Sequence, residues 1–441
     1  MIRSFLLVWL LSAALLGGFG CLPCAAQSVT LSVDSLFRLI DDNSRSLDLK
    51  SLCVDEAREG EEVARSRRLP MLDAALSVGY LGNGYVTDRD FSGGMGIRNP
   101  HSHNNFALEA MQVIYSGGAI SGGIRMAELN ARMAELDLEQ SRQQVRFLML
   151  GWLIDLHCLH NRQRILDEHM ALTRQVLDDM HARFDEGVVL LSDITRYELQ
   201  LENLRLQKEK ADEAVRTTDY RLANALGFEP RTTEFIPMLP QPDSSFRPEP
   251  ERHWQDLAQT SNLSLRKADL GIDIGETERR IIAAGKRPQL SLFAYGRFDS
   301  PIVTEVPVLN KNMMYWGFGL RLSYNISSLY TTNRRVRKAQ IAVMASRRAY
   351  DIGVEKVQDD VQAAYEAYRT AETELRTQEK SLELARQNYD IVSDRFDNGM
   401  ALITDMVDAA NVRLSSEIGL ENARTMLLFS YYRLKYVTNT L

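Results

Sequence analysis

The sequence predicts a mixed α/β membrane protein made of two internal structural repeats, with strands suited to a β-barrel and long helices suited to a coiled-coil α-helical barrel. Three observations indicate this fold class. Several short signatures recur at one constant separation, four segments alternate apolar and polar residues, and two long segments carry a helical pattern.

The repeat is visible in a helix-break signature. Arg183-Phe184-Asp185-Glu186-Gly187 returns as Arg395-Phe396-Asp397-Asn398-Gly399 (395 − 183 = 212). Two further matches keep that separation: Leu191-Ser192-Asp193 with Ile403-Thr404-Asp405, and Tyr220-Arg221-Leu222 with Tyr432-Arg433-Leu434. A register held over so long a stretch indicates one unit built twice. We assign the first repeat to residues 27–227 and the second to residues 253–441.

Bulk composition excludes two classes of protein. Of the 441 residues 45% are hydrophobic and 25% are charged, which are values of folded proteins and argue against wholesale disorder. The formal net charge of −7 argues against nucleic acid as a partner, because binding to phosphates needs a basic face.

The amino terminus predicts export. Arg3 precedes an apolar run over 5–19 and then Cys24-Ala25-Ala26, which is the pattern of a secretory signal peptide over residues 1–26. The run is too short for a membrane-spanning helix. A lipid anchor at Cys21 is the alternative, and it is disfavoured because Gly18-Phe19-Gly20 fits a lipidation signal poorly.

Cleavage after Ala26 would leave two cysteines, Cys53 and Cys158. They lie far apart in the sequence and follow no metal-binding or disulfide spacing. We therefore expect both to be buried structural residues.

Both repeats have the same predicted plan of an opening helix, two strands, a very long helix, a short break and another long helix. The opening helices run from about Val33 to Arg67 and from about Trp254 to Lys286. Pro70 follows the first, and Pro288 follows the second, as expected where a helix stops.

Four strands are predicted, over residues 71–82, 105–115, 289–298 and 313–325. In the last of them an apolar set alternates with a polar or small set: Trp316, Phe318, Leu320, Leu322 and Tyr324 against Tyr315, Gly317, Gly319, Arg321 and Ser323. Strands of about ten residues with one apolar face fit a membrane barrel. An ordinary half-buried sheet is the alternative.

Four long helices are predicted, over residues 118–186, 192–226, 331–397 and 404–438. A heptad seam of mostly apolar and small residues runs along the third: Val361, Ala364, Tyr368, Ala371, Leu375, Gln378, Leu382, Ala385, Tyr389, Val392 and Phe396. Such a seam is typical of helices packed side by side. The first long helix would measure roughly 100 Å at 1.5 Å per residue. Between the repeats, the proline-rich residues 228–252 predict an extended connector.

Four strands cannot close a barrel, and open sheet edges are not tolerated in lipid. If these strands enter a membrane, several chains must therefore contribute four each. Two chains would give eight strands and a filled interior, whereas three would give twelve strands and room for a channel. The long helices, repeated around the same axis, would continue the tube as a helical barrel.

On specific motifs the chain resembles the TolC family of outer-membrane efflux and secretion channels. The most specific is the break Arg-Phe-Asp-x-Gly followed five residues later by Ser or Thr and then Asp, present once in each repeat. Tyr115-Ser116-Gly117-Gly118 is similar to a family element between strand and helix. Two departures are Val113, where the family often has proline, and Ser327-Ser328 in place of the second Gly-Gly pair.

The resemblance implies a homotrimer with a twelve-stranded barrel in the outer-membrane lipid and an α-helical tunnel across the periplasm of a Gram-negative type envelope. It implies the exit duct of a tripartite efflux or type I secretion system, which conducts substrates passively. The expected partners are a periplasmic adaptor protein and an inner-membrane pump.

The helix breaks are the expected adaptor-docking tips under this resemblance: Arg183, Phe184, Gly187, Ser192, Asp193, Arg395, Phe396, Gly399 and Thr404. From the residues alone, Gly187 and Gly399 suit a left-handed backbone at a helix end. Ser192 and Thr404 can cap the next helix, with Asp193 and Asp405 placed near its positive dipole. A merely stable helical hairpin is the alternative.

The second break continues as Asp405-Met406-Val407-Asp408-Ala409, which is similar to the family's aperture-lining segment. Asp405 and Asp408 are three residues apart and share one helix face. In a trimer they would form carboxylate rings that attract cations. Solvated first-turn carboxylates are the alternative. Arg196 occupies the place of Asp408 in the first repeat, so the two tips are not equivalent.

Enzymatic and cofactor signatures are not found. His157 and His160 lie one helical turn apart, but they have no further ligand at suitable spacing, so we expect no metal site. No nucleophile elbow or phosphate-binding loop is recognisable, and we expect no catalytic residues. The alternative function is a non-channel coiled-coil scaffold of the periplasm or cell surface. It would not need the apolar strand face that includes Trp316 and Phe318.

Overall fold

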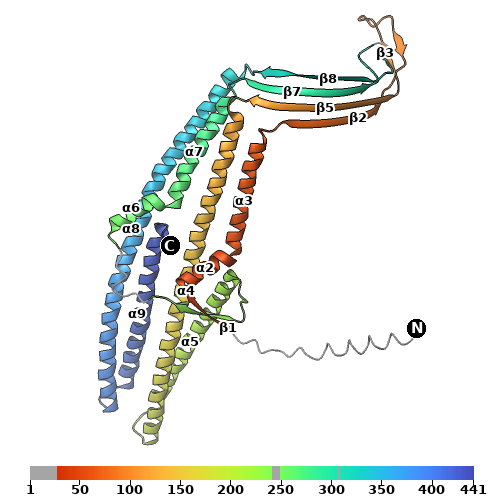
Figure 1. Cartoon of the computed structure of the whole chain (residues 1–441). Helices are drawn as coiled ribbons and strands as arrows, with labels where there is room; N and C mark the ends of the chain where they lie inside the picture. Colours follow the sequence, from red (N-terminus) through yellow and green to blue (C-terminus); the bar gives the residue numbers. More distant parts are fainter. Residues whose placement is uncertain (1–26, 241–248, 306–307) are drawn as a thin grey trace, which may run out of the picture. The chain divides into compact units, whose positions relative to one another are not determined.

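The computed structural model describes residues 27–240, 249–305 and 308–441. The expected signal peptide, Cys21 and part of the connector lie outside these residues. The described residues form two compact units, one of residues 27–45, 143–240, 249–254 and 362–441, and one of residues 46–142, 255–305 and 308–361. The chain is mostly helical with some strands (Figure 1).

The helices are α2 (Val33–Asn43), α3 (Arg45–Ser66), α4 (Ala119–Asp185), α5 (Leu191–Leu226), α6 (Glu251–Ser261), α7 (Leu263–Ala284), α8 (Ser328–Asp397) and α9 (Ile403–Val437). The strands are β1 (Gln27–Ser32), β2 (Met71–Tyr80), β3 (Gly84–Val86), β4 (Met95–Ile97), β5 (Ser102–Tyr115), β6 (Thr233–Met238), β7 (Gln289–Ser300) and β8 (Met313–Ser323).

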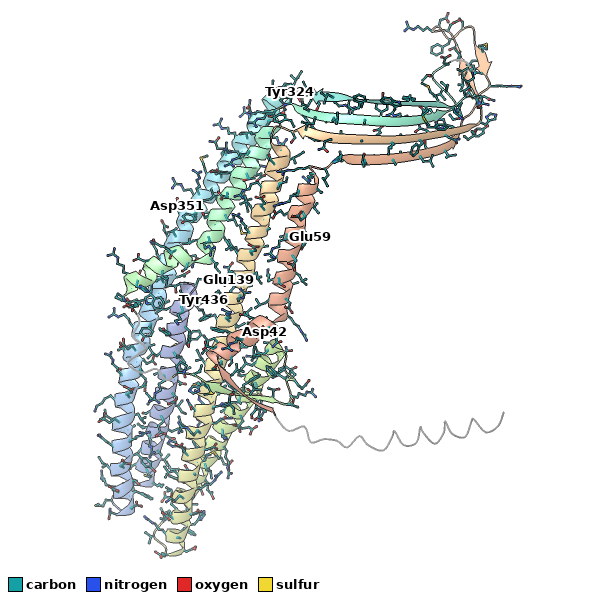
Figure 2. All side chains as sticks on the ribbon, viewed as in Figure 1. Asp42, Glu59, Glu139, Tyr324, Asp351 and Tyr436 are labelled. Atoms are coloured by element: carbon teal, nitrogen blue, oxygen red, sulfur yellow. The ribbon has the colours of Figure 1, made fainter. Side chains whose placement is uncertain are left out.

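The second unit contains a four-stranded sheet in the order β2-β5-β7-β8, and each neighbouring pair is antiparallel. Figure 1 shows the four strands side by side. Asp73 lies opposite Glu109, Glu109 opposite Tyr295, and Tyr295 opposite Gly317, so these residues form one row across the sheet. β2 and β8 are the edge strands. Tyr324, labelled in Figure 2, lies just after β8, where the chain turns toward α8.

The two faces of this sheet differ sharply, as the alternation in the sequence predicts. Directly opposed residues share a face. One face is apolar and exposed to a large extent: Leu72, Leu76, Val78 and Tyr80 on β2, Phe106 and Leu108 on β5, Leu292 on β7, and Trp316, Phe318, Leu320 and Leu322 on β8. On β8, Trp316 is 73% exposed and Phe318 is 71% exposed. The opposite face carries the charged side chains of all four strands.

Each of the two predicted opening helices is broken, so the prediction of one continuous helix was wrong at both places. α2 and α3 are separated at Ser44, whose backbone is extended (φ −75°, ψ 108°). α6 and α7 are separated at Asn262, whose Oδ1 accepts hydrogen bonds from the N–H groups of Ser264 and Leu265 at 2.9 and 3.3 Å. The apolar pattern continues through both breaks, and neither has the proline or glycine that commonly marks a helix end.

The long helices pack along the predicted heptad seam. α4 has 67 residues and α8 has 70. Val361, Ala364, Tyr368 and Ala371 are at most 2% exposed, and the small alanines allow close approach of the neighbouring helix. In the first unit α8 and α9 form an antiparallel hairpin (Figure 1). None of the described helices is long and apolar enough to cross a membrane.

A small parallel sheet was not foreseen. β1 pairs with β6, and β6 lies within the segment expected to be an extended connector. The side chain of Phe235, on β6, is completely buried. The cysteine expectation was also wrong: Cys53 is exposed, and Cys158 is half-buried with its Sγ 3.4 Å from Asn422 Oδ1. The separation between two cysteines in the sequence does not report whether either one lies on the buried side of its helix.

The carboxyl of Asp219, on α5, holds this small sheet against the helix. Asp219 is 6% exposed, and its Oδ1 accepts the Phe235 N–H at 3.1 Å. Burial raises the pKa of Asp219 to about 6, with a smaller contribution from the charge of Glu234, although the Phe235 hydrogen bond opposes the rise. The charged form is therefore disfavoured in the folded protein.

We predict that Asp219→Asn makes the stability of the protein less sensitive to a rise in pH from about 4 to above 6. An Asp pKa of about 6 in the folded chain lies above the unfolded value of about 3.9, so this group's stabilisation is present below pH 4 and is lost as the pH rises through 6. Thermal unfolding followed by circular dichroism in detergent gives the unfolding temperature of each protein. The unfolding temperature of the variant minus that of the parent should become more positive from pH 4.5 to pH 7.5. A difference independent of pH would contradict the argument.

Candidate functional site: the helix tips

Two helical hairpin tips carry most of the predicted site residues. The first joins α4 to α5, and the second joins α8 to α9. Gly187 and Gly399 have φ values of 73° and 71°, which confirms the predicted left-handed conformation. At the first tip the Gly187 N–H donates to Phe184 O and the Val188 N–H donates to Arg183 O, both at 2.9 Å.

The second tip repeats this geometry. The Gly399 N–H donates to Phe396 O at 2.9 Å, and the Met400 N–H donates to Arg395 O at 2.7 Å. Paired bonds of this kind define the Schellman motif, which satisfies the last carbonyls of a helix. The repeated Arg-Phe-Asp-x-Gly signature thus corresponds to one backbone device used twice.

The predicted caps were wrong. Leu190 and Leu402 occupy the cap positions, so Ser192 and Thr404 lie inside the first turn of α5 and α9 and do not cap them. The Asp405 carboxylate instead accepts the Leu402 N–H at 3.2 Å, which is half of a capping box. Each helix begins one residue earlier than predicted, at Leu191 and at Ile403.

An ion pair joins the two tips. Arg183 Nη2 lies 3.1 Å from Asp397 Oδ1, and the Arg183 guanidinium lies over the Phe396 ring at 5.7 Å from its centroid. Asp397 belongs to the repeated signature but was not assigned a role. Because this pair is partly solvated, it contributes about 1 kcal/mol or less. Its main consequence is to align the tips.

Apolar side chains are exposed around both breaks. At the first tip Val188, Leu190 and Leu191 are 72%, 68% and 63% exposed. At the second tip Met400 and Leu402 are 64% and 70% exposed. Exposed apolar groups gathered at one place are typical of a surface that binds another protein.

Asp405 and Asp408 lie on an exposed face of α9, as their spacing predicts. The opposite face is held in the core by Ile403, Met406 and Ala409, which are at most 7% exposed. This core contacts both hairpins and therefore fixes the direction in which the two carboxylates point. Among the described residues no group of acidic, histidine or cysteine side chains is arranged to hold a metal ion.

A buried polar pair lies in the same helical bundle, away from the tips. It was not predicted from the sequence. His169 Nε2 on α4 is 2.8 Å from Glu417 Oε2 on α9, and both side chains are almost fully buried. Burial alone raises the pKa of Glu417, but the hydrogen bond and charge of His169 and the charge of Arg413 outweigh it and bring that pKa to about 2. The partners are 248 residues apart in the sequence, so no local pattern links them.

The comparisons with known proteins agree with this architecture. The sequence model of the family described as outer membrane efflux protein matches residues 36–228 and 254–440, and the chain belongs to that family. A curated relative is the outer membrane protein TolC of Vibrio cholerae serotype O1, which is 22% identical over 322 residues that make up 71% of this chain and 72% of the relative.

Solved structures show the same fold. The outer membrane protein VceC of Vibrio cholerae is similar with a TM-score of 0.73 and 14% identity, over 92% of this chain and 95% of that one. The CmeC outer membrane channel of Campylobacter jejuni has a TM-score of 0.73 and 14% identity, over 92% and 85% of the two chains. The family consists of outer-membrane efflux channels and not of enzymes, which favours a channel over a scaffold.

We predict that Gly399→Ala weakens the second tip by about 1 kcal/mol, because an alanine Cβ is strained at positive φ. No atom lies within 4 Å of the added Cβ, so the loss would come from the backbone alone. Hydrogen exchange of the amides around residues 395–405 measures it. Gly60→Ala is the matched control, since Gly60 lies within α3 with open space around it and should become more stable. Unchanged exchange at the tip would contradict the assignment.

Proposed function

We propose that this protein is the exit channel of a tripartite efflux or type I secretion system, conducting substrates passively from the periplasm through the outer membrane. The observation that carries the proposal is the four-stranded sheet with one exposed apolar face and all its charges on the other, in a chain of the outer membrane efflux family. Lipid would cover the apolar face, and the polar face would line the pore.

We propose that three copies close a twelve-stranded barrel. β2 and β8 have free edges in the described chain, and unpaired backbone groups are costly in lipid. Each neighbouring pair in the sheet is antiparallel, so β8 also runs antiparallel to β2. β8 of one copy can thus pair with β2 of the next in the same manner, until the ring closes. Three copies leave an open interior, whereas two would fill it with side chains.

The helices would continue this ring as an α-helical tunnel across the periplasm. α4 and α8 have nearly equal lengths, and the family model matches the chain on both sides of the connector, which supports two equivalent repeats over residues 27–227 and 253–441. A lipid anchor at Cys21 is not part of the proposal.

The tips would be the docking surface for a periplasmic adaptor that links the channel to an inner-membrane pump. The support is the pair of Schellman turns, the Arg183–Asp397 bridge and the exposed apolar residues Val188, Leu190 and Leu402. The residues proposed for docking are Arg183, Phe184, Gly187, Ser192, Asp193, Arg395, Phe396, Gly399 and Thr404. Such a surface offers an adaptor a rigid apolar rim with a few charges for orientation.

Asp405 and Asp408 would line the aperture at the end of the tunnel. In a trimer, each exposed carboxylate would be repeated around the axis, giving two rings of negative charge. Their position on a helix face held by the buried Met406 and Ala409 supports this role, because the carboxylates cannot turn into the bundle.

The first test is the oligomeric state of the protein extracted from outer membranes. We expect an SDS-resistant species of about three times the 50.1 kDa chain, or slightly less after removal of the signal peptide, that dissociates on heating. Chemical crosslinking of the native membrane should give the same mass. A monomer recovered from the soluble periplasmic fraction would exclude the channel.

We predict that Asp405→Ala combined with Asp408→Ala raises single-channel conductance or removes block by multivalent cations in planar bilayers. Alanine is smaller than aspartate, which widens the constriction, and loss of the carboxylates removes the affinity of the constriction for cations. Asp193→Ala is the matched control, because Asp193 occupies the position in α5 that Asp405 occupies in α9. Equal conductance and equal block in the double variant and the parent would remove the aperture role.

A further inference from the structure

The charged residues of the sheet differ in whether they have a partner within the chain. Its acidic and basic residues all lie on the polar face: Asp73, Glu109, Arg297, Asp299 and Arg321. The residues on the inner strands have partners within the chain. Arg297 Nη2 lies 2.6 Å from Glu109 Oε1, and Asp299 accepts hydrogen bonds from Tyr315 Oη at 3.0 Å and from Asn105 Nδ2.

The two charges on the edge strands differ from these. Asp73 on β2 and Arg321 on β8 are exposed, and neither forms an ion pair within the described part of the chain. The Arg321 guanidinium lies over the Phe293 ring at 5.1 Å from its centroid, on the polar face. One edge of the sheet thus ends in a free carboxylate and the other in a free guanidinium.

We propose that Arg321 of one copy pairs with Asp73 of the next copy on the inner face of the barrel. This inference rests on the proposed trimeric channel and assigns a specific contact between its subunits. The partner is a second copy of this chain, because the two charges are complementary and lie on the two edges that must meet for the ring to close.

The geometry of the sheet fixes the direction in which neighbouring copies are offset. The Leu81 N–H donates to His101 O at 3.0 Å, so the backbone groups of odd-numbered residues of β2 point toward β5. Consider the sheet viewed from its apolar face, with the Tyr80 end of β2 at the top. The chirality of L-amino acids then places β5 to the left of β2. The order β2-β5-β7-β8 therefore runs leftward as seen from the lipid.

The offset brings the two charges together. Twelve strands tilted right-handedly by about 35–45° require a stagger of about four to six residues from one copy to the next. Within one chain Asp73 is in the row of Gly317. The stagger moves Asp73 of the next copy along β8, toward the helices, to a place between Arg321 and Ser323. With a stagger of about four or about six residues, the long Arg321 side chain reaches the Asp73 carboxylate of the next copy.

This pair would act mainly on register. A slip of the β8–β2 interface by two residues keeps the apolar face outward, so the alternation of side chains alone does not forbid it. An ion pair favours one of these registers over the others, because complementary charges across an interface set alignment more than they add affinity.

The test uses cysteines in a background with Cys53→Ser and Cys158→Ser. Asp73→Cys with Arg321→Cys, treated in outer membranes with a short bismaleimide, should give covalent dimers and trimers that survive boiling in SDS. Either single variant should give none. The matched control is Glu109→Cys with Arg297→Cys, whose parent side chains form an ion pair within one chain, so this variant should give only monomer.

Charge reversal gives an independent reading without cysteines. Asp73→Arg alone and Arg321→Asp alone should lower the temperature at which the SDS-resistant trimer dissociates, and the double variant should restore it. If the parent forms trimers and pores, but the double cysteine variant gives no subunit crosslinks and the double charge reversal gives no rescue, this contact is overturned and the channel stands. If the parent forms no oligomer, the proposed function fails as well.

Discussion

The free edges of the four-stranded sheet are the constraint on which the proposed assembly depends. β2 and β8 each present a row of backbone N–H and C=O groups without partners in the described chain. In water such edges would be tolerable, but in lipid every unpaired group costs several kcal/mol. A sheet with the exposed residues Trp316 and Phe318 on one face is suited to lipid and therefore cannot keep its edges open. Oligomerisation is the way in which a chain with so few strands can satisfy both conditions.

The ends of the long helices also carry backbone groups that need partners, and the hairpins provide these partners within the chain. Their tips end in Schellman turns at Gly187 and Gly399, so the last carbonyls of α4 and α8 are satisfied without a neighbouring chain. The surface left there is apolar, and its turns are held by backbone hydrogen bonds with a small contribution from the Arg183–Asp397 bridge. A rigid apolar rim loses little conformational entropy on binding, which is a useful property for docking another protein.

Charged side chains differ in whether they have a partner within the chain. Inside the bundle, Glu417 is buried but has His169, Arg386 and Arg413 around it, so its ionised form is retained. At the tip, the side chains of Asp405 and Asp408 are exposed to solvent. On the sheet, the inner charges are paired within the chain and the edge charges are not. The unpaired groups therefore mark the surfaces at which we propose that copies or ions meet.

The sequence by itself determined the features that depend on local periodicity. The alternation from Tyr315 to Tyr324 predicts the two faces of β8, and the heptad from Val361 to Phe396 predicts the buried side of α8, because side-chain direction in a strand or helix follows position along the chain. The glycines of the repeated break predict their own backbone conformation for the same reason.

Only the tertiary structure decided what depends on distant partners. The pairing of β1 with β6 and the bond between His169 and Glu417 join residues far apart in the sequence, and no local pattern records them. The break at Asn262 does have a local signal, because its side chain caps the next helix, but the apolar pattern that continues through the break favours a single helix. The cap positions at Leu190 and Leu402 belong here too, since leucine has no side-chain acceptor that would mark a helix start in the sequence. Periodicity fixes which way a residue faces, whereas the identity of the residue it meets is decided by the fold.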